Sequence, residues 1–310
     1  MTDVRAGIVA EPAGDVTAVL GEGPYWVPED SCLLWVDIPA GLLHRTEIPS
    51  GQTVTTDLGS VSAAFPAHGG AILYAGGNQV VVREPVPGGG LGKPGSSGEW
   101  TTRTVAHSPA GDDVRFNDAS VDPAGRVWVG SMDMEETKPL GELYRLDPGG
   151  VLTPVVSGAT VSNGLGWSPD GSRLYYADTP TKRVDVFDYD QAMGEVYGRR
   201  VFADLSDAAG APDGLTVDLD GYVWVAMWDG GVLRRFALSG EPDAVVPVPV
   251  ARPTSVAFGG NGMAELYVTT ASFNLTPAQR EAQPLAGRLL RLVPGPVGLP
   301  STTTRAIIQA

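Results

Sequence analysis

A repeated unit constrains the fold of this chain more than any other feature of its sequence. Each unit is a tight turn followed by a short apolar run with an aromatic residue, as in "DPAGRVWVG" and "DLDGYVWVA". The aromatic residues are spaced 39, 54, 48, 48 and 43 residues apart; they are Trp35, Tyr74, Trp128, Tyr176, Trp224 and Tyr267. This period is typical of the four-stranded blades of a β-propeller. Six units therefore predict an all-β, six-bladed propeller whose blades are four-stranded antiparallel sheets.

The composition agrees with an architecture of many short strands. The 310 residues include 41 glycines and 26 prolines, which interrupt long helices but suit tight turns. In the fifth unit, Gly or Asp separates four strand-like runs: "GLTVDL", "YVWVAMW", "VLRRFAL" and "AVVPVPV". Because all-β architectures of this size often fold as one unit, we expect a single domain over residues 1–310.

Two parts of the chain interrupt the regular repeat. Residues 85–100, "PVPGGGLGKPGSSGEW", lengthen the second unit, and their composition predicts a flexible insertion between two strands of that blade. The sixth unit has too little chain for four strands, so another segment must close the ring. The outer strand could come from "VRAGIVAE" at residues 4–11 or from "TTRAIIQA" at residues 303–310, and the sequence leaves both open.

The charge and the cysteine content exclude several classes of protein. The net charge of −15 is unfavourable for binding nucleic acid or anionic membranes, so neither is an expected partner. The one cysteine, Cys32, allows no disulfide within the chain, and we expect it in the core. No segment has the apolar length of a signal peptide or a membrane span, which leads us to expect a cytoplasmic protein.

Each unit also has a polar residue 11 to 13 positions before its aromatic residue. In order along the chain these residues are Glu22, Ser62, Asn117, Asn163, Asp213 and Ser255. The first strand of each propeller blade lies along the central channel, so residues that begin these strands should converge at one mouth. Two carboxylates and two carboxamides would offer oxygen ligands to a hard divalent cation. The alternative for Asn163 and Asp213 is a role in turns, because Asn-Gly and Asp-Gly are common turn dipeptides.

At these positions the chain resembles the family of gluconolactonase, regucalcin (senescence marker protein) and luciferin-regenerating enzyme. The segments that carry the resemblance are "GEGPYW", "RFNDASVDPAGR", "SNGLGWSPDG", "PDGLTVDLDG" and "VWVAMWDGG". They extend over nearly the full length, and their combination is more specific than any one of them. The resemblance implies a six-bladed propeller with one divalent metal ion in its channel.

The resemblance also implies roles for individual residues. The implied metal ligands are Glu22, Asn163 and Asp213. Arg115 and Asn117 match residues that contact the substrate in the family. Counting from Arg115 places a further substrate-binding acid at Glu135, although Asp133 or Glu136 could take that place if the loop differs.

The implied activity is hydrolysis of a sugar lactone, a small-molecule substrate, to the free acid. The metal would act as a Lewis acid on the ring carbonyl and stabilise the oxyanion. Asp213 would be both a metal ligand and the general base for the attacking water, while Arg115 and Asn117 would hold oxygen atoms of the substrate. We expect calcium, and zinc, manganese, magnesium or iron would fit the same ligands. Two alternatives stay open: hydrolysis of other esters or organophosphates, and a non-catalytic calcium-binding propeller.

Overall fold

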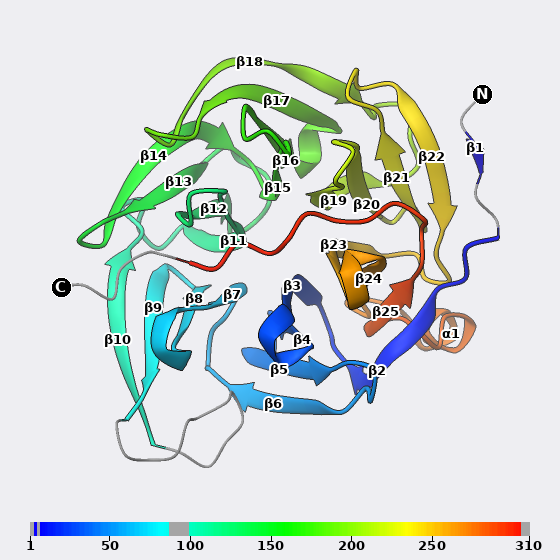
Figure 1. The fold of residues 1–310 in the computed structure, drawn as a ribbon, viewed down its shortest axis with the longest axis horizontal. Coiled ribbons are helices and arrows are strands. Elements are labelled where there is room, and N and C mark those ends of the chain that lie inside the picture. The colour runs from blue at the N-terminus through cyan, green and yellow to red at the C-terminus, as the bar shows by residue number, and fades with distance from the viewer. Residues whose placement is uncertain (1–2, 5–6, 87–98, 305–310) are drawn as a thin grey trace.

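Six sheets are arranged as blades around a central channel (Figure 1). The structure is a computed structural model that describes residues 3–4, 7–86 and 99–304. In every blade the first strand lies nearest the channel, and the fourth lies farthest out, except in the fifth blade, where a short extra strand flanks it. The prediction of a six-bladed propeller with four-stranded antiparallel blades is therefore confirmed.

Strands at equivalent places in the blades follow one another around the ring, from the first blade to the sixth. The inner strands are β3 (Gly21–Val27), β7 (Ala63–Pro66), β11 (Val114–Val121), β15 (Ser162–Trp167), β19 (Ala211–Val217) and β23 (Pro253–Gly259). The second strands are β4 (Cys32–Asp37), β8 (Ile72–Gly76), β12 (Val127–Asp133), β16 (Arg173–Asp178), β20 (Val223–Trp228) and β24 (Glu265–Thr270). The third strands are β5 (Leu42–Glu47), β9 (Gln79–Pro85), β13 (Gly141–Asp147), β17 (Arg183–Asp190), β21 (Val232–Phe236) and β25 (Arg288–Leu292).

The outer strands and the short helices complete the blades. The outer strands are β6 (Thr53–Asp57), β10 (Trp100–His107), β14 (Val151–Ala159), β18 (Glu195–Asp204), β22 (Pro242–Pro247) and β2 (Glu11–Thr17). The helical elements are α1 (Pro277–Ala282) and the 3-10 turns η1 (Pro28–Asp30), η2 (His68–Gly70), η3 (Thr179–Thr181) and η4 (Asn261–Met263).

An N-terminal strand closes the ring. β2 pairs antiparallel with β25, with Pro12 opposite Leu290, and becomes the outer strand of the sixth blade. This strand begins where the predicted segment 4–11 ends, so the N-terminal alternative named the right end of the chain but not the right residues. β1 (Asp3–Val4) instead pairs in parallel with β22 and adds a fifth strand to the fifth blade. Of the C-terminal alternative, residues 303–304 form no strand and residues 305–310 lie outside the described residues.

The predicted insertion connects two strands of the second blade. β9 and β10 are antiparallel neighbours, with Pro85 opposite Trp100. The residues between them therefore join the third strand to the outer strand of that blade. Residues 87–98 lie outside the described part of the chain, so the flexibility of this segment stays a prediction.

The repeated aromatic residues are buried, and in two blades they bond the turn that precedes their strand. All six lie in second strands and are at most 7 % exposed. In the third blade, the carboxylate of Asp122 accepts hydrogen bonds from the backbone N–H of Arg126 at 2.9 Å and from the indole N–H of Trp128 at 3.0 Å. Asp218 accepts the same indole bond from Trp224 at 3.0 Å in the fifth blade. The aspartate closes the turn and accepts a hydrogen bond from a buried indole N–H. The repeated unit therefore includes both the turn and a residue of the core.

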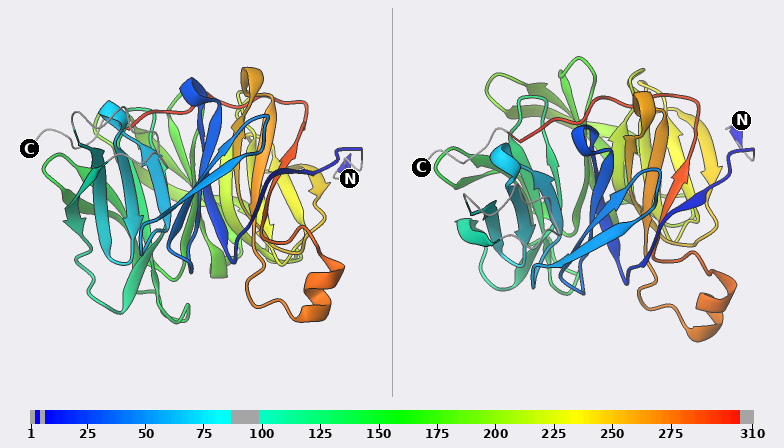
Figure 2. Two further views of the ribbon diagram at one scale, coloured as in Figure 1. Left: turned by 90° about the horizontal axis from the view of Figure 1, so that it is seen from below. Right: turned by 60° about the horizontal axis from the view of Figure 1, so that its bottom comes forward.

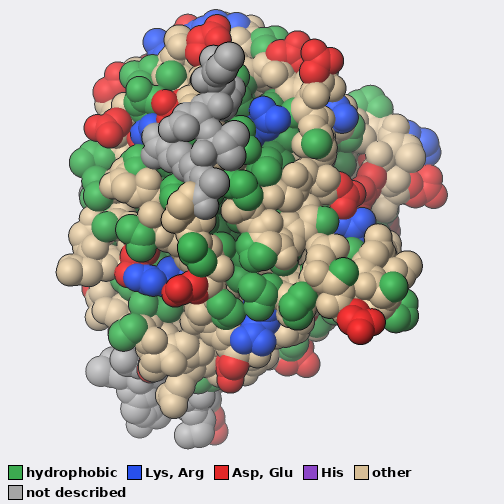
Figure 3. Space-filling model, turned by 90° about the vertical axis from the view of Figure 1, so that its right-hand side faces the viewer, with side chains coloured by type: hydrophobic (Ala, Val, Ile, Leu, Met, Phe, Trp, Pro, Cys, Tyr) green, Lys and Arg blue, Asp and Glu red, His purple; other side chains and the backbone are tan. Residues whose placement is uncertain are grey.

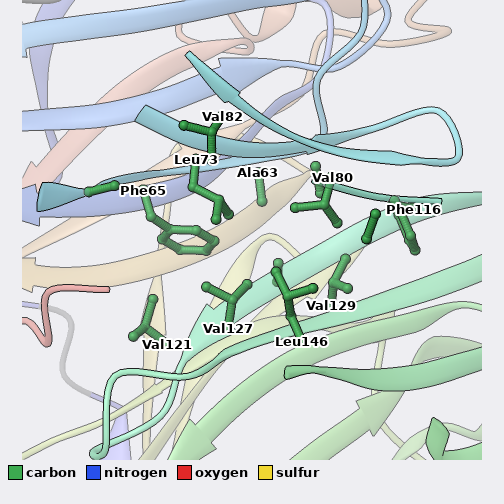
Figure 4. Close-up of a cluster of buried hydrophobic side chains, with 14 of the residues drawn as sticks. Ala63, Phe65, Leu73, Val80, Val82, Phe116, Val121, Val127, Val129 and Leu146 are labelled. Atoms are coloured by element: carbon green, nitrogen blue, oxygen red, sulfur yellow. The ribbon is translucent and has the colours of Figure 1, made fainter. Parts of the chain in front are cut away.

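The apolar core lies between neighbouring blades. Figure 4 shows the interface between the second and third blades, where Phe65 and Leu73 from one blade pack with Val127 and Val129 from the other. Cys32 is fully buried in the core between the first and second blades, as predicted. Because close-packed side chains resist displacement, the inner strands are held at fixed positions around the channel.

The two mouths of the channel differ. At one mouth the C-terminal segment 293–304, called the strap below, crosses over the channel (Figures 1 and 2). The Tyr25 hydroxyl donates to the carbonyl oxygen of Thr302 at 2.7 Å, and the Thr304 hydroxyl donates to that of Pro66 at 2.9 Å. α1 lies on the opposite face, where the inner strands begin. The strap therefore covers the mouth farther from the predicted site.

The chain has more acidic than basic residues, 36 against 21. On the side that Figure 3 shows, acidic and basic side chains are interspersed with hydrophobic ones. Within the described ranges, no helix has the length and apolar character needed to cross a membrane.

Candidate active site

The polar residues predicted at the channel mouth do meet around the channel. Those that lie in inner strands are each at most 9 % exposed; they are Glu22, Asn117, Asn163, Asp213 and Ser255. Ser62 directly precedes β7 and is also buried. The six positions are far apart in the sequence, and the ring of inner strands brings them to one channel (Figure 1).

A β-bulge occurs at four of these positions. In β3 the pairing register shifts directly after Glu22, and in β19 it shifts in the segment that contains Asp213. β11 and β15 shift in the same way around Asn117 and Asn163. A bulge inserts an unpaired residue and turns side chains out of the regular alternation of a strand. The bulges therefore set the directions of the candidate ligands.

The glycines that follow Asn163 and Asp213 lie inside strands. A Cβ atom on Gly164 would be 2.5 Å from the backbone carbonyl oxygen of Asp213, and a Cβ atom on Gly214 would clash with the side chain of Ser255. Glycine is therefore required at both places because the backbone or side chain of the neighbouring inner strand approaches closely. The interpretation of these Asn-Gly and Asp-Gly pairs as turns is wrong.

Burial and mutual repulsion raise the pKa values of the acidic side chains in the channel. For Glu22 burial is the largest cause, followed by the charges of Asp213 and Asp118. For Asp213 burial is again the largest cause, and Asp118 adds to it. Burial raises the pKa of Asp118 to about 7, although its carboxylate accepts a hydrogen bond from the N–H of Ala119 at 2.8 Å. Buried carboxylates that repel one another need a positive partner, so the cluster has the electrostatics of a cation site.

The donor atoms also fit a cation. Asp213 Oδ1 is buried and has no hydrogen-bond partner among the described residues. The side-chain nitrogen of Asn163 donates to the Thr179 hydroxyl at 3.1 Å, which leaves its amide oxygen for the channel. Across the part of the chain that is described, no three His, Cys, Asp or Glu side chains form a metal-binding group. The candidate set instead includes a carboxamide, and an all-oxygen set of this kind suits a hard divalent cation.

Arg115 and Asn117 form a chain of hydrogen bonds beside the candidate ligands. Arg115 Nη1 donates to the carbonyl oxygen of Phe116 and to Asn117 Oδ1, both at 3.0 Å. Asn117 in turn donates to the carbonyl oxygen of Ser162 in the next blade at 3.1 Å. Both polar ends of Asn117 are thus used within the protein. Asn117 orients Arg115, and the other nitrogen atoms of the guanidinium are left for a ligand.

Glu136, rather than Glu135, lies beside Arg115. Arg115 and Glu136 line a cavity of about 530 Å³ on this face, called the mouth cavity below, and Glu135 does not line it. Burial lowers the pKa of Arg115, and the negative charge of Glu136 opposes this. The Asp133 carboxylate fixes the loop, because it accepts hydrogen bonds from the two backbone N–H groups that follow Glu136, at 2.9 and 2.8 Å. The alternative with Glu136 at the substrate therefore fits this loop better than Glu135.

A second cavity lies on the other side of the candidate ligands. It measures about 890 Å³, includes Asp118 in its lining, and is covered by residues 299–304 of the strap. Leu20, just before β3, lines the mouth cavity, and Gly23, just after Glu22 in β3, lines the second cavity. Along the chain, Glu22 thus lies between a residue that lines the mouth cavity and one that lines the cavity beneath the strap.

Asp118 belongs to the acidic cluster with Glu22 and Asp213, although the family motifs assigned it no role. Regular alternation along a strand would turn it away from the side that Asn117 faces. The bulge in β11 breaks this alternation and leaves Asp118 half-buried, close enough to Glu22 and Asp213 for its charge to raise the pKa of both. The run of polar residues in "RFND" is the sequence signal that could have indicated it.

Known proteins share both this sequence pattern and this fold. Residues 20–272 match the family described as "SMP-30/Gluconolactonase/LRE-like region". The chain belongs to this family. Pentonolactonase XacC of Haloferax volcanii is 35 % identical to the chain over 257 residues, which is 83 % of each protein.

Two solved structures extend the family likeness to the whole chain. Regucalcin from Agrobacterium tumefaciens, described as a calcium-binding protein, has a TM-score of 0.89 at 25 % identity and covers 99 % of this chain and 100 % of its own. Luciferin-regenerating enzyme has a TM-score of 0.86 at 27 % identity, with 97 % and 100 % covered.

Membership of the SMP-30/gluconolactonase/LRE-like family confirms the resemblance found in the motifs. It also confirms the expectation of a lactonase-type enzyme at the level of the family. The matched range contains every predicted site residue, from Glu22 to Asp213. It ends one residue before Phe273, so α1, β25 and the strap lie outside it.

Proposed function

We propose that this protein is a metal-dependent hydrolase that opens a sugar lactone to the free aldonic acid. The observation that carries the proposal is the buried Oδ1 atom of Asp213, which has no hydrogen-bond partner in the described part of the chain and lies in a channel that also holds Glu22 and Asn163. The family, which includes a relative named pentonolactonase, supports a lactone as the substrate.

Three side chains would hold the metal ion: Glu22, Asn163 and Asp213. Calcium is the first candidate, because the regucalcin neighbour is described as a calcium-binding protein. Zinc, manganese, magnesium and iron are the alternatives that the same donors would accept. When bound, the metal would polarise the lactone carbonyl and stabilise the oxyanion that forms there.

The side chains at the mouth would position the substrate and move the proton. Arg115 would bind oxygen atoms of the lactone through its planar fork of donors, with Asn117 holding the guanidinium in place. Glu136 would accept hydrogen bonds from substrate hydroxyls. Asp213 would take a proton from the water that adds to the carbonyl carbon. The ring C–O bond then breaks, and the ring oxygen leaves as a hydroxyl.

A substrate and metal panel tests the proposal. The metal-stripped protein is assayed with aldonolactones, an aryl ester and an organophosphate, before and after addition of each metal. We expect lactone hydrolysis to depend on one added divalent metal. Turnover of only the ester or the organophosphate would contradict the substrate class. Tight calcium binding without any turnover would instead support the non-catalytic alternative.

A further inference from the structure

The carboxylate of Asp133 binds the loop that follows it. Asp133 is the last residue of β12 and is buried. Its Oδ2 atom accepts hydrogen bonds from the N–H of Thr137 at 2.9 Å, from the Thr137 hydroxyl at 3.2 Å and from the N–H of Lys138 at 2.8 Å. Glu136 lines the mouth cavity, whereas Asp133 does not. Asp133 is therefore used within the protein, to hold residues 134–138.

Glu136 has an uncommon backbone conformation inside this loop. Its φ angle is +58°, in the left-handed region that a residue with a long side chain seldom adopts. The N–H of Glu136 donates to the backbone carbonyl oxygen of Asp133 at 3.0 Å, so both the backbone and the side chain of Asp133 hold this turn. A residue stays in such a conformation only where its surroundings enforce it, and residues of this kind are concentrated at functional sites.

Glu136 also lies near the groups of the candidate active site. Burial lowers the pKa of Arg115, and the negative charges of Glu136 and Glu22 oppose this. Burial is the largest cause of the raised pKa of Asp213, and the charge of Glu136 adds to it. Because the interaction of two charges weakens with distance, Glu136 is close to both the guanidinium and a candidate metal ligand. A ligand that contacts Arg115 in the mouth cavity is therefore within reach of Glu136.

We propose that Asp133 is a positioning residue, whose carboxylate holds the loop 134–138 in the left-handed turn that presents Glu136 to the substrate beside Arg115. The inference rests on the proposed function, in which Glu136 accepts hydrogen bonds from substrate hydroxyls. A loop that is ordered before the substrate arrives loses little conformational freedom on binding, so more of the energy of these hydrogen bonds appears as affinity. Asp133 thus acts on the substrate only through Glu136.

A double-mutant cycle tests whether Asp133 acts through Glu136. KM and kcat of the metal-loaded protein are measured for Asp133→Ala, Glu136→Ala and the double variant, with the aldonolactone that the unmodified protein hydrolyses fastest. We expect Asp133→Ala to raise KM about tenfold and to change kcat by less than about twofold, because it removes binding and not chemistry. In the Glu136→Ala background, Asp133→Ala should raise KM no further, since residues that act as one unit are not additive.

Two further variants separate positioning from a general loss of stability. Asp133→Asn keeps a neutral and weaker acceptor at the same place. We expect it to raise KM less than Asp133→Ala does, and it takes the place of that variant in the cycle if the alanine variant does not fold. Asp190→Ala is the matched control, because Asp190 also accepts two backbone N–H groups of its own turn, those of Ala192 and Met193 at 2.9 and 3.1 Å. It lies between β17 and β18 and should leave KM unchanged.

Three results would overturn the inference. They are an unchanged KM in Asp133→Ala, the same further rise in KM when this change is added to Glu136→Ala, and a weaker metal affinity in folded Asp133→Ala. If the unmodified protein hydrolyses no aldonolactone, the proposed function fails. The cycle is then measured as the Kd of galactono-1,4-lactone by calorimetry. The inference stands only if Asp133→Ala weakens binding when Glu136 is present and does not when Glu136 is replaced by Ala.

Discussion

The α-carbon of Gly164 in β15 lies against the backbone carbonyl of Asp213 in β19, so closely that a Cβ atom would be 2.5 Å from that oxygen. Asn163 precedes Gly164, so this contact sets the separation of two candidate metal ligands on neighbouring blades. The side chain of Leu215 is also 2.9 Å from the same Cβ position. The spacing of the ligands therefore depends on the absence of a side chain at residue 164.

Gly164→Ala tests this contact. The added methyl group must push β15 and β19 apart, and overpacking of this kind destabilises a protein by about 1–3 kcal/mol. We expect a lower Tm and a metal affinity at least several-fold weaker, both measured by calorimetry. Gly7→Ala is the matched control, because a Cβ atom there meets nothing within 4 Å. A variant with unchanged Tm and unchanged metal affinity would show that the spacing is not fixed by this contact.

Asp213→Asn separates the base from the metal ligand. The substitution keeps an oxygen donor of the same shape but removes the proton acceptor, so we expect turnover to fall by about two to four orders of magnitude. Metal affinity should fall less than in Asp213→Ala, which loses the ligand altogether. Steady-state kinetics and metal titration measure the two effects, and Asp220→Asn at an exposed turn serves as control. Near-normal turnover in Asp213→Asn would exclude Asp213 as the base.

Arg115→Ala should affect the substrate and spare the metal. The guanidinium lies close enough to lower the pKa of Glu22, so its removal takes a positive charge away from a candidate ligand. Metal affinity should therefore stay the same or rise, while kcat/KM falls. Lys should rescue only part of the loss, because an ammonium lacks the fork of donors. Glu22→Ala should do the reverse and lose the metal first; loss of metal in folded Arg115→Ala would contradict this assignment.

The half-buried carboxyl group of Asp118 sets the sign of a pH effect in the metal-free protein. Burial raises its pKa to about 7, above the value near 4 of an unfolded chain. Between these values the native state binds the extra proton, so the stability linked to Asp118 is complete below about pH 4 and is lost as the pH rises through about 7. We expect the Tm of the metal-free protein to decrease between pH 5 and 8, and Asp118→Asn to flatten this decrease. A parallel decrease in both proteins would show that other groups cause it.

Tyr25→Phe tests the attachment of the strap. The substitution removes the 2.7 Å hydrogen bond to the carbonyl oxygen of Thr302 and little else. We expect a loss of about 1 kcal/mol in the free energy of unfolding, measured in urea, together with faster proteolysis in the C-terminal segment. Tyr197→Phe is the control, because that hydroxyl binds Glu195 on an exposed outer strand. Equal stability of the two variants would mean that this bond does not hold the strap.

The sequence by itself determined the architecture of the ring. The aromatic residue of each unit and the turn before it are local features, and the Asp122–Trp128 bond shows that they interact within a few residues. Such local features recur along the sequence at a regular spacing. The number of blades and the strands that begin at the channel could therefore be predicted. The family motifs added candidate roles for Glu22, Asn163 and Asp213, which the ring of inner strands then placed around one channel.

Only the tertiary structure decided the features that depend on contacts between distant segments. The closing strand starts at Glu11 because β2 must match the register of β25, which lies at the other end of the chain. The bulge that turns Asp118 into the acidic cluster depends on the pairing of β11 with β12, and the hydrogen bonds of Asp133 decide that Glu136 reaches Arg115. The lining of the mouth cavity combines segments of the first, second, third and sixth blades. No periodic pattern records such contacts, because register, loop shape and packing between blades are fixed only when the ring closes.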